Sequence, residues 1–238
     1  MSLLKPRFDY ISIKRSSVEG KRLYMTPDGT PVPSVTTVLS ATTPKKKKEA
    51  LQKWRDSIGH ERAQKITTEA ANRGTRMHTY LENYIKDGAL KDRGSNPFSW
   101  PSHLMAELVI QEGLSKVDEV WGVEVPLYFP GLYAGTTDGI GIHLGDEAIL
   151  DYKQSNRVKT EEQVEDYYLQ LTAYALAHNE VHGTNIKKGV VLMAVKPKMS
   201  SDGLIEGKPT YQEFILKPDD FNMWADRWWK RLEQYYLI

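Results

Sequence analysis

Asp138, Asp151 and Lys153 lie close together near the middle of the chain. Carboxylate oxygens are the ligands that Mg²⁺ and Mn²⁺ prefer, and an ammonium group beside them can hold a water molecule or a phosphate oxygen. The Asp-x-Lys pattern is short, however. Taken alone it is explained equally well by a cross-strand salt bridge on a solvated hairpin, which would contribute about 0.2–1 kcal/mol. The elements that position these residues must decide between the two interpretations.

These residues fall on two segments that predict an antiparallel β-hairpin. Residues 133–143 are rich in aromatic, β-branched and glycine residues, and residues 147–153 contain an apolar run. The Gly-Asp dipeptide at 145–146 predicts a two-residue turn between them. This turn would place Asp138 directly opposite Lys153.

The alternation of side chains along a strand then predicts which of them meet. Successive side chains point to opposite faces, so Asp151 shares a face with Lys153 and therefore with Asp138. Cross-strand neighbours on one face lie about 4.5–5.5 Å apart, and diagonal neighbours roughly 7–8 Å apart. At these separations one divalent ion can contact both carboxylates, with the lysine beside them.

Composition limits the classes of protein to which the chain can belong. Its 238 residues, 40% of them hydrophobic and 26% charged, suit one large globular domain or two small ones. No run of eighteen apolar residues is present, so we expect no membrane-spanning helix and no membrane partner. The absence of cysteine excludes disulfides, thiolate zinc sites and cysteine-ligated iron–sulfur clusters.

Charge is distributed unevenly along the chain. Residues 1–76 contain 16 Lys and Arg against 7 Asp and Glu, whereas residues 77–238 contain 16 against 24. A basic first third joined to an acidic remainder suits a protein that holds a polyanion with one part and a metal ion with the other. Basic segments are also commonly no more than solvated surface, and the run of four lysines at 45–48 alone would be read in that way.

Local patterns predict helices first and strands later. We expect a short hairpin over residues 10–26 closed near Glu19-Gly20, and a helix that begins with Ser34 as its N-cap. Apolar spacing predicts further helices over residues 45–59, 60–87 (with an interruption near Gly74) and 103–114. The strands and helices expected after these are a strand at 120–129, the hairpin, a helix at 161–178, strands at 190–195 and 210–216, and a last helix from 218 to 236.

This order predicts an α/β fold in which residues 1–238 form a single domain. Residues 1–115 would form a mainly helical N-terminal lobe with a short hairpin, and residues 116–238 an α/β catalytic core.

Three further groups are candidates for the same site. Gln170 and Tyr174 lie four residues apart on a predicted helix, as do His78 and Glu82 on another, so each pair shares a helix face. The alternative for His78 and Glu82 is an ordinary surface His–Glu pair, and the alternative for Gln170 and Tyr174 is an amphipathic helix with a polar residue at its margin. Glu124 is a lone acid on the strand before the hairpin, and it is either an accessory ligand or a rim charge. An imidazole among carboxylates favours Mg²⁺ or Mn²⁺ over zinc.

Five short patterns follow one another along the chain: Pro33-Ser34-Val35-Thr36, Gly74-Thr75-x-x-His78, Gly135-x-x-Asp138, Asp151-Tyr152-Lys153 and Gln170-x-x-x-Tyr174. With these, the chain resembles the PD-(D/E)xK nuclease superfamily. It is most similar to the RecB-like exonuclease branch, which includes the mitochondrial genome maintenance exonuclease and related phage and CRISPR-associated nucleases. Thr137 stands where the nominal motif has proline, a common departure, and the lack of cysteine sets the chain apart from the iron–sulfur members.

The resemblance implies a fold and a set of roles. The fold would be a restriction-endonuclease-like central mixed sheet flanked by helices. The metal ligands would be His78, Asp138, Asp151 and the backbone carbonyl of Tyr152. Lys153 would orient or deprotonate the attacking water, and Gln170 and Tyr174 would position the lysine and the scissile phosphate. Ser34, Thr36, Lys53 and Arg73 would contact the phosphates of the nucleic acid.

The resemblance also implies a metal-dependent DNA exonuclease that acts at single-stranded ends, in a bacterial or phage-infected cytoplasm or, if a transit peptide is missing, in the mitochondrial matrix. A structure-specific or flap endonuclease would use the same residues. A non-catalytic nucleic-acid-binding module of the same fold is the alternative from a different class, but the intact Asp138, Asp151 and Lys153 argue against it. A metal-dependent phosphatase fits the basic N-terminal region poorly.

Overall fold

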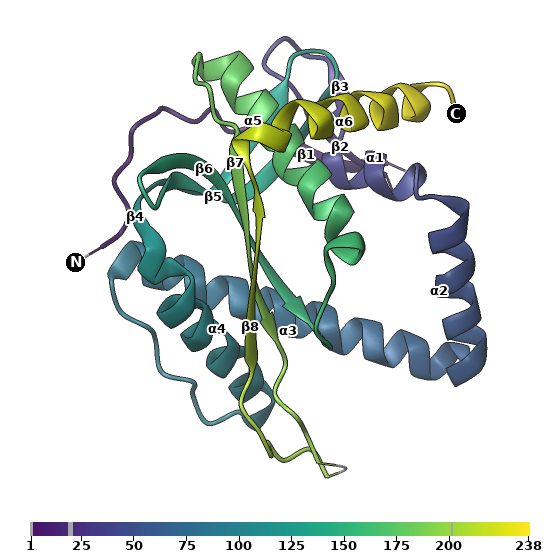
Figure 1. The fold of residues 1–238 in the computed structure, drawn as a ribbon, viewed down its shortest axis with the longest axis vertical. Coiled ribbons are helices and arrows are strands. Elements are labelled where there is room, and N and C mark those ends of the chain that lie inside the picture. Colours follow the sequence, from purple (N-terminus) through teal and green to yellow (C-terminus); the bar gives the residue numbers. More distant parts are fainter. Residues whose placement is uncertain (1, 19–20, 201) are drawn as a thin grey trace.

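A mixed five-stranded sheet runs through the middle of the molecule, with helices on both of its faces (Figure 1). The computed structural model describes residues 2–18, 21–200 and 202–238. The strands lie in the spatial order β4 (Val117–Phe129), β5 (Tyr133–His143), β6 (Asp146–Ser155), β7 (Lys188–Val195) and β8 (Thr210–Leu216). β6 and β7 pair in parallel and the other neighbours are antiparallel, which confirms the expected α/β architecture with a mixed central sheet.

Two layers of helices bury the two faces of this sheet. One layer contains α1 (Val35–Ala41), α5 (Glu165–His182) and α6 (Phe221–Tyr236), and the other contains α3 (His60–Asp87) and α4 (Trp100–Glu112). Along β7, Val191 and Met193 pack into the first layer, whereas Leu192 packs into the second. All eight residues of β7 are buried, as expected for a central strand covered on both faces.

The link between the parallel strands β6 and β7 places α5 over the sheet. The segment enters through a 3₁₀ turn, η3 (Glu161–Val164), which Thr160 caps, and α5 ends at Gly183 in the left-handed conformation. At Gly189 of β7, an added Cβ would lie 2.8 Å from the Cβ of Leu171 on α5. This glycine therefore lets the helix lie close against the strand that follows it.

The N-terminal region forms a second, smaller sheet. The hairpin expected over residues 10–26 is present as β1 (Lys14–Val18) and β2 (Lys21–Met25), and β3 (Pro31–Pro33) adds a third strand. The turn expected at Glu19-Gly20 lies outside the described residues. Ser34 caps α1 as predicted, because its Oγ accepts a hydrogen bond from the N–H of Thr37 at 3.0 Å.

Helix α2 (Lys45–Ile58) stands away from the sheet and connects α1 to α3 (Figure 1). None of its fourteen residues, all of which are described, is buried. Leu51 and Trp54, whose spacing predicted the helix, are 46% and 36% exposed. Lys47 pairs with Glu165 and Asp166 at the start of α5, at 3.8 and 3.2 Å. The apolar spacing therefore predicted the helix correctly, but the apolar side chains on it do not belong to a buried core.

Helix α3 runs without interruption from His60 to Asp87, so the expected break near Gly74 is wrong. The glycine serves close packing instead, since an added Cβ would lie 3.3 Å from Cγ of Gln154 on β6. Met77, Leu81 and Ile85 form a stripe along this helix that is fully buried against the sheet.

Short 3₁₀ turns complete the chain: η1 (Pro97–Ser99), η2 (Leu114–Lys116) and η4 (Pro218–Asp220). Within the described part of the chain, no helix has both the length and the apolar character needed to cross a membrane.

The β5–β6 turn differs from its expected position. Leu144 and Gly145 form the turn, with φ of 50° and 83°, and His143 pairs with Asp146. The register therefore moves by two residues, and the expected pairing of Asp138 with Lys153 is wrong. Because a shift of two residues preserves the side-chain faces, the expectation that Asp138, Asp151 and Lys153 share one face survives the correction.

Candidate functional site

The candidate site lies where β5 and β6 stop pairing. Their last backbone pair is Gly139 with Leu150. Beyond it, the N–H of Tyr152 donates to Oδ2 of Asp138 at 2.6 Å rather than to a backbone carbonyl. The Asp138 carboxylate thus takes the place of a strand acceptor at this fork between the two strands, and β6 fixes its position.

Asp151 is buried beside Lys153 on the α5 side of the fork. The ammonium of Lys153 donates to Oδ1 of Asp151 at 2.6 Å. Oδ2 lies equally close but outside hydrogen-bonding geometry, so it accepts no hydrogen bond from any described residue. Burial raises the pKa of Asp151 to about 6, Lys153 opposes this shift and Asp138 adds to it. This carboxylate is 2% exposed, and the Lys153 ammonium beside both of its oxygens balances its charge.

His78 reaches the fork from α3, on the opposite face of the sheet. Its Nε2 lies 2.8 Å from the carbonyl oxygen of Tyr152, and its Nδ1 lies 3.3 Å from Oδ1 of Asp138. Because a carbonyl only accepts, Nε2 carries a proton and donates it. Burial lowers the pKa of His78, but Asp138 outweighs this effect and the net pKa is raised. The imidazole therefore links the β6 backbone to the Asp138 carboxylate.

The charges of the fork depend on one another. Burial alone would raise the pKa of Asp138, but His78, Lys153 and the Tyr152 N–H together hold it below its ordinary value. For Lys153, burial lowers the pKa, and the two aspartates more than compensate, so its pKa is raised. Lys153 is therefore an ammonium ion held between two carboxylates.

A cavity of about 240 Å³ opens over the fork. It is lined by Arg15, Tyr24, Ser34, Thr36, His78, Glu124, Gly135, Thr136, Asp138, Gln170 and Tyr174. Gln170 donates to the hydroxyl of Tyr174 at 3.3 Å. The Tyr174 ring lies against Gly135 of β5, where an added Cβ would lie 2.6 Å from Cε1 of the ring. Residues from five separate sequence patterns thus face or underlie one cavity.

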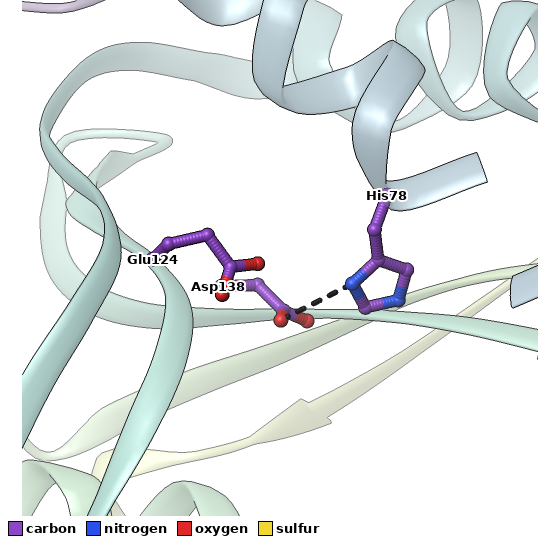
Figure 2. Close-up of side chains that lie close together, drawn as sticks. All are labelled: His78, Glu124 and Asp138. Atoms are coloured by element: carbon purple, nitrogen blue, oxygen red, sulfur yellow. Dashed lines mark ion pairs between the residues drawn. The ribbon is translucent and has the colours of Figure 1, made fainter. Parts of the chain in front are cut away.

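Figure 2 shows Glu124 beside Asp138 and His78. One ligating atom from each of these three residues lies within 4.8 Å of the other two. Glu124 has a φ of 52°, which is unusual for a residue other than glycine, and its pKa is raised by burial and by the nearby Asp138. Glu82, the other expected accessory, lies outside this group and pairs with Lys86 at 2.6 Å.

The four residues expected to contact phosphates are only partly brought together. Ser34 and Thr36 line the cavity, and Ser34 also caps α1. Arg73 lies on α3 beyond the lining, where it donates to Gln154 at 3.0 Å and to Asn156. Lys53 lies on the exposed helix α2, away from the lining residues.

The sequence analysis missed three side chains near the fork. Arg15 and Tyr24 reach the cavity from the N-terminal hairpin, and the Tyr24 hydroxyl lies 3.2 Å from Oγ1 of Thr136. The ring of Tyr167 on α5 lies 5.2 Å from Nζ of Lys153. No local spacing marks the hairpin residues, because only the packing of the small sheet against β5 brings them here. Tyr167 could have been found, since it lies one helical turn before Gln170.

Comparisons with known proteins bear on the fold. No family model matches the chain, and no curated protein matches it. Among solved structures, it is similar to a protein from Eubacterium rectale that is provisionally described as an exonuclease. The TM-score is 0.50 at 10% identity, over 71% of this chain and 66%, slightly less than two thirds, of that protein. A second structure, SSO0001, has a TM-score of 0.36 at 12% identity over 82% of this chain and 73% of its own, too low to support an argument.

The five-stranded mixed sheet flanked by helices and the first of these neighbours together confirm the expected fold class, which is restriction-endonuclease-like. Many unrelated activities share common folds, so the function must be argued from the site itself.

Proposed function

We propose that this protein is a metal-dependent DNA exonuclease that hydrolyses phosphodiester bonds at single-stranded ends. The observation that carries the proposal is the meeting, at one fork, of His78, Asp138, Asp151, Lys153 and the Tyr152 carbonyl. These groups come from α3, β5 and β6, so no short stretch of sequence accounts for their proximity. The fold of the provisionally described exonuclease from Eubacterium rectale supports a nuclease.

The residues at the fork fit a divalent metal ion. Two carboxylates, an imidazole and a backbone carbonyl form a donor set of mainly oxygen atoms, and the buried Oδ2 of Asp151 accepts no hydrogen bond from a described residue. His78, Asp138, Asp151 and the carbonyl of Tyr152 would hold Mg²⁺ or Mn²⁺. When bound, such an ion lowers the pKa of a ligated water and stabilises the negative charge that develops on the phosphate.

The remaining residues of the fork and cavity would position the reactants. Lys153, held as an ammonium ion by both aspartates, would orient the attacking water and offset charge on the phosphate. Gln170 and Tyr174 lie in the cavity wall and would hold a phosphate oxygen against the fork. Asp151 fixes Lys153 through the 2.6 Å hydrogen bond, so removing either side chain releases the other.

The nucleic acid would enter from the side of the small N-terminal sheet. Arg15, Ser34 and Thr36 line the same cavity as Asp138 and would contact the phosphates of the strand. The basic balance of residues 1–76 supports a polyanionic substrate on this side. Lys53 and Arg73 would extend the contact beyond the cavity.

Cleavage of end-labelled DNA tests the proposal. Linear single strands labelled at the 5′ or 3′ end, the matching duplex and a covalently closed single-stranded circle are each incubated with Mg²⁺ or Mn²⁺. We expect linear single strands to be degraded from an end, circles to survive, and the Asp151→Asn variant to be inactive. Cutting of the circle would establish an endonuclease instead, and DNA binding without any cleavage would establish a binding module.

A further inference from the structure

Tyr167 is a side chain at the fork to which the proposed function gives no role. It lies on α5, one helical turn before Gln170, and it belongs to none of the five sequence patterns. Nζ of Lys153 lies over its ring, 5.2 Å from the ring centre. At this distance the negative face of an aromatic ring attracts an ammonium ion. The ring and the lysine therefore form a cation–π pair beside the proposed metal ligands.

The ammonium group of Lys153 has three N–H donors to direct. One of them is donated to Oδ1 of Asp151 at 2.6 Å, and no other residue in the described part of the chain accepts a hydrogen bond from this group. The Tyr167 ring covers a second side of the ammonium. The side chain of Lys153 is 21% exposed, so part of it still faces solvent. The aspartate and the ring together restrict the directions in which Lys153 can present an N–H to a water molecule or a phosphate oxygen.

Asp151 by itself leaves this lysine considerable freedom. A lysine side chain is a flexible four-carbon stem that ends in a compact charge, and one hydrogen bond fixes only one point of that charge. Asp151 is also a proposed metal ligand, so its oxygens have a second task. The ring of Tyr167 is not a ligand and serves Lys153 alone. Its face offers a broad second contact that does not depend on the state of the carboxylate.

The first turn of α5 is held on both sides of Tyr167. Asp166 pairs with basic side chains of α2 and α6 at 3.2 and 3.3 Å, and Tyr168 is buried and donates a hydrogen bond to the first residue of η3. Between them, the half-buried Tyr167 packs against the core beneath α5. Its hydroxyl makes no hydrogen bond with a described residue. The neighbours therefore fix the position of the ring, and it is the ring that meets Lys153.

We propose that Tyr167 is a positioning residue for the cleavage reaction, and that the face of its ring directs the Lys153 ammonium toward the scissile phosphate. This inference rests on the proposed function, which gives Lys153 the contact with the attacking water and the phosphate. Positioning of this kind raises kcat, because it restricts the ammonium to the direction that the transition state requires. The KM for DNA depends instead on the other side chains that line the cavity.

Two substitutions that differ only in keeping the ring test this role. Tyr167→Leu keeps an apolar side chain and removes the ring, and we expect kcat on an end-labelled single strand to fall about tenfold with KM changed by less than about twofold. Tyr167→Phe keeps the ring, so its kcat should lie within about threefold of the wild type. Equal losses of kcat in the two variants, or a loss confined to KM, would overturn the proposal.

Fluorinated phenylalanines in place of Tyr167 separate the charge distribution of the ring from its shape. Each added fluorine weakens the negative face of the ring while changing its volume little. We expect kcat to fall stepwise as one, two and three fluorines are added, and to approach the rate of Tyr167→Leu. A rate that does not respond to fluorination would show that the side chain only fills space, and would overturn the proposal.

Tyr211 on β8 provides a matched control. Its ring lies 5.5 Å from Nζ of Lys116, which pairs with Glu213 at 2.9 Å, so a lysine, a carboxylate and a tyrosine meet here as they do at the fork. None of the three lines the cavity. Tyr211→Leu should cleave within about twofold of the wild type, with thermal unfolding measured for every variant. A loss of kcat in Tyr211→Leu as large as that in Tyr167→Leu would refute a specific role for Tyr167.

Nuclear magnetic resonance of Lys153 separates this proposal from the proposed nuclease. In protein containing isotope-labelled lysine, the ring current of Tyr167 should shift the Hε signals of Lys153, identified by their loss in Lys153→Arg, to higher field. The shift should remain in Tyr167→Phe and disappear in Tyr167→Leu.

The two proposals can therefore fail separately. If the wild type cuts no DNA, the nuclease is rejected, and the Lys153 signals still decide whether the ring orients the lysine. Signals that are unshifted in the wild type, or equally shifted in Tyr167→Leu, would overturn the role of Tyr167. If the wild type and Tyr167→Leu cut DNA at the same rate, the nuclease stands and the positioning role falls.

Discussion

An Asp–Lys pair lies near each end of strand β6, one between Asp146 and Lys188 of β7 and the other within β6 itself, and the two pairs are built in opposite ways. Near the β5–β6 turn, the lysine is the buried partner: Lys188 is 9% exposed, and it donates to the His143 carbonyl at 2.8 Å and to Asp146 at 3.0 Å. Asp146 itself is 65% exposed to solvent. At the fork the carboxylate is the buried partner, with Asp151 2% and Lys153 21% exposed.

The turn and the fork also share an unusual backbone torsion, but its surroundings differ between them. Each has a residue other than glycine at positive φ, Leu144 at the turn and Glu124 near the fork. At the turn, the N–H of Leu144 donates to the Lys116 carbonyl at 3.0 Å, and the N–H of Gly145 donates to Asp118 at 2.8 Å. Near the fork, the side chain of Glu124 accepts no hydrogen bond from any residue that the structure describes. The backbone of the turn is thus held by bonds from outside the hairpin, whereas the Glu124 side chain lines the cavity.

Replacing the aspartate of each pair should give the largest contrast. Asp151→Asn should lower DNA cleavage at least roughly a hundredfold, because it removes both a proposed metal ligand and the partner that holds Lys153. Asp146→Asn, the matched control at the other end of the strand, should cleave within about twofold of the wild type. Initial rates on an end-labelled single strand measure both, and retained activity in Asp151→Asn would refute the site.

The pH dependence of stability should separate the two ends next. The folded-state pKa of Asp151, about 6, lies above its ordinary value, so the metal-free protein gains stability from this group at low pH. That gain is complete below the ordinary pKa of 3.8 and is lost as pH rises through 6, a total of about 3 kcal/mol. Asp151→Asn should remove this trend, whereas Asp146→Asn should keep it.

Urea unfolding at pH 5 and pH 8 with a chelator present measures this trend. The wild type alone cannot isolate the contribution of Asp151, because burial and His182 lower the pKa of His178 to about 3. Protonation of this histidine destabilises the folded protein as pH falls. The difference between the wild type and Asp151→Asn cancels that contribution. An equal pH dependence in the two proteins would contradict the raised pKa of the buried Asp151 carboxylate.

Replacing Lys188 should affect stability and leave the chemistry intact. Lys188→Met keeps the volume of the side chain but leaves the His143 carbonyl without its donor, which should cost roughly 2 kcal/mol of unfolding free energy. The folded variant should cleave DNA at the wild-type rate. A loss of cleavage without a loss of stability would show that the two ends are coupled.

The smallest expected effect lies at the turn. Leu144→Asn places a residue that tolerates positive φ at an exposed position, and it should stabilise the protein by about 0.5–1 kcal/mol. Thermal unfolding beside Leu144→Ala, which keeps the strain, measures the gain. A variant no more stable than Leu144→Ala would mean that the hydrogen bonds at the turn already remove the strain.

The sequence predicted most of the elements and the side-chain faces, because both depend on local periodicity. The helix over residues 60–87, the cap at Ser34 and the extent of β8 are confirmed. The alternation rule also placed Asp138 and Asp151 on one face despite the wrong turn, since the error in register was an even number of residues.

The errors have tertiary causes. A leucine at positive φ is locally unfavourable, so the turn was expected one residue later, at Gly145-Asp146. Bonds from outside the hairpin support Leu144 in its place. In the same way Gly74 read as a helix breaker, although its role is to let α3 approach β6. The direction of the Glu124 side chain depends on its positive φ, which no pattern of residue types predicts.

Helix α2 is expected to unfold locally before the rest of the protein does. A fourteen-residue helix that buries none of its described side chains gains almost no hydrophobic stabilisation, and at this length an isolated helix is marginal in water. The ion pairs of Lys47 hold its first turn, and α3 holds its end. Its amides should therefore exchange with solvent through local fraying rather than through global unfolding, long before those of β7.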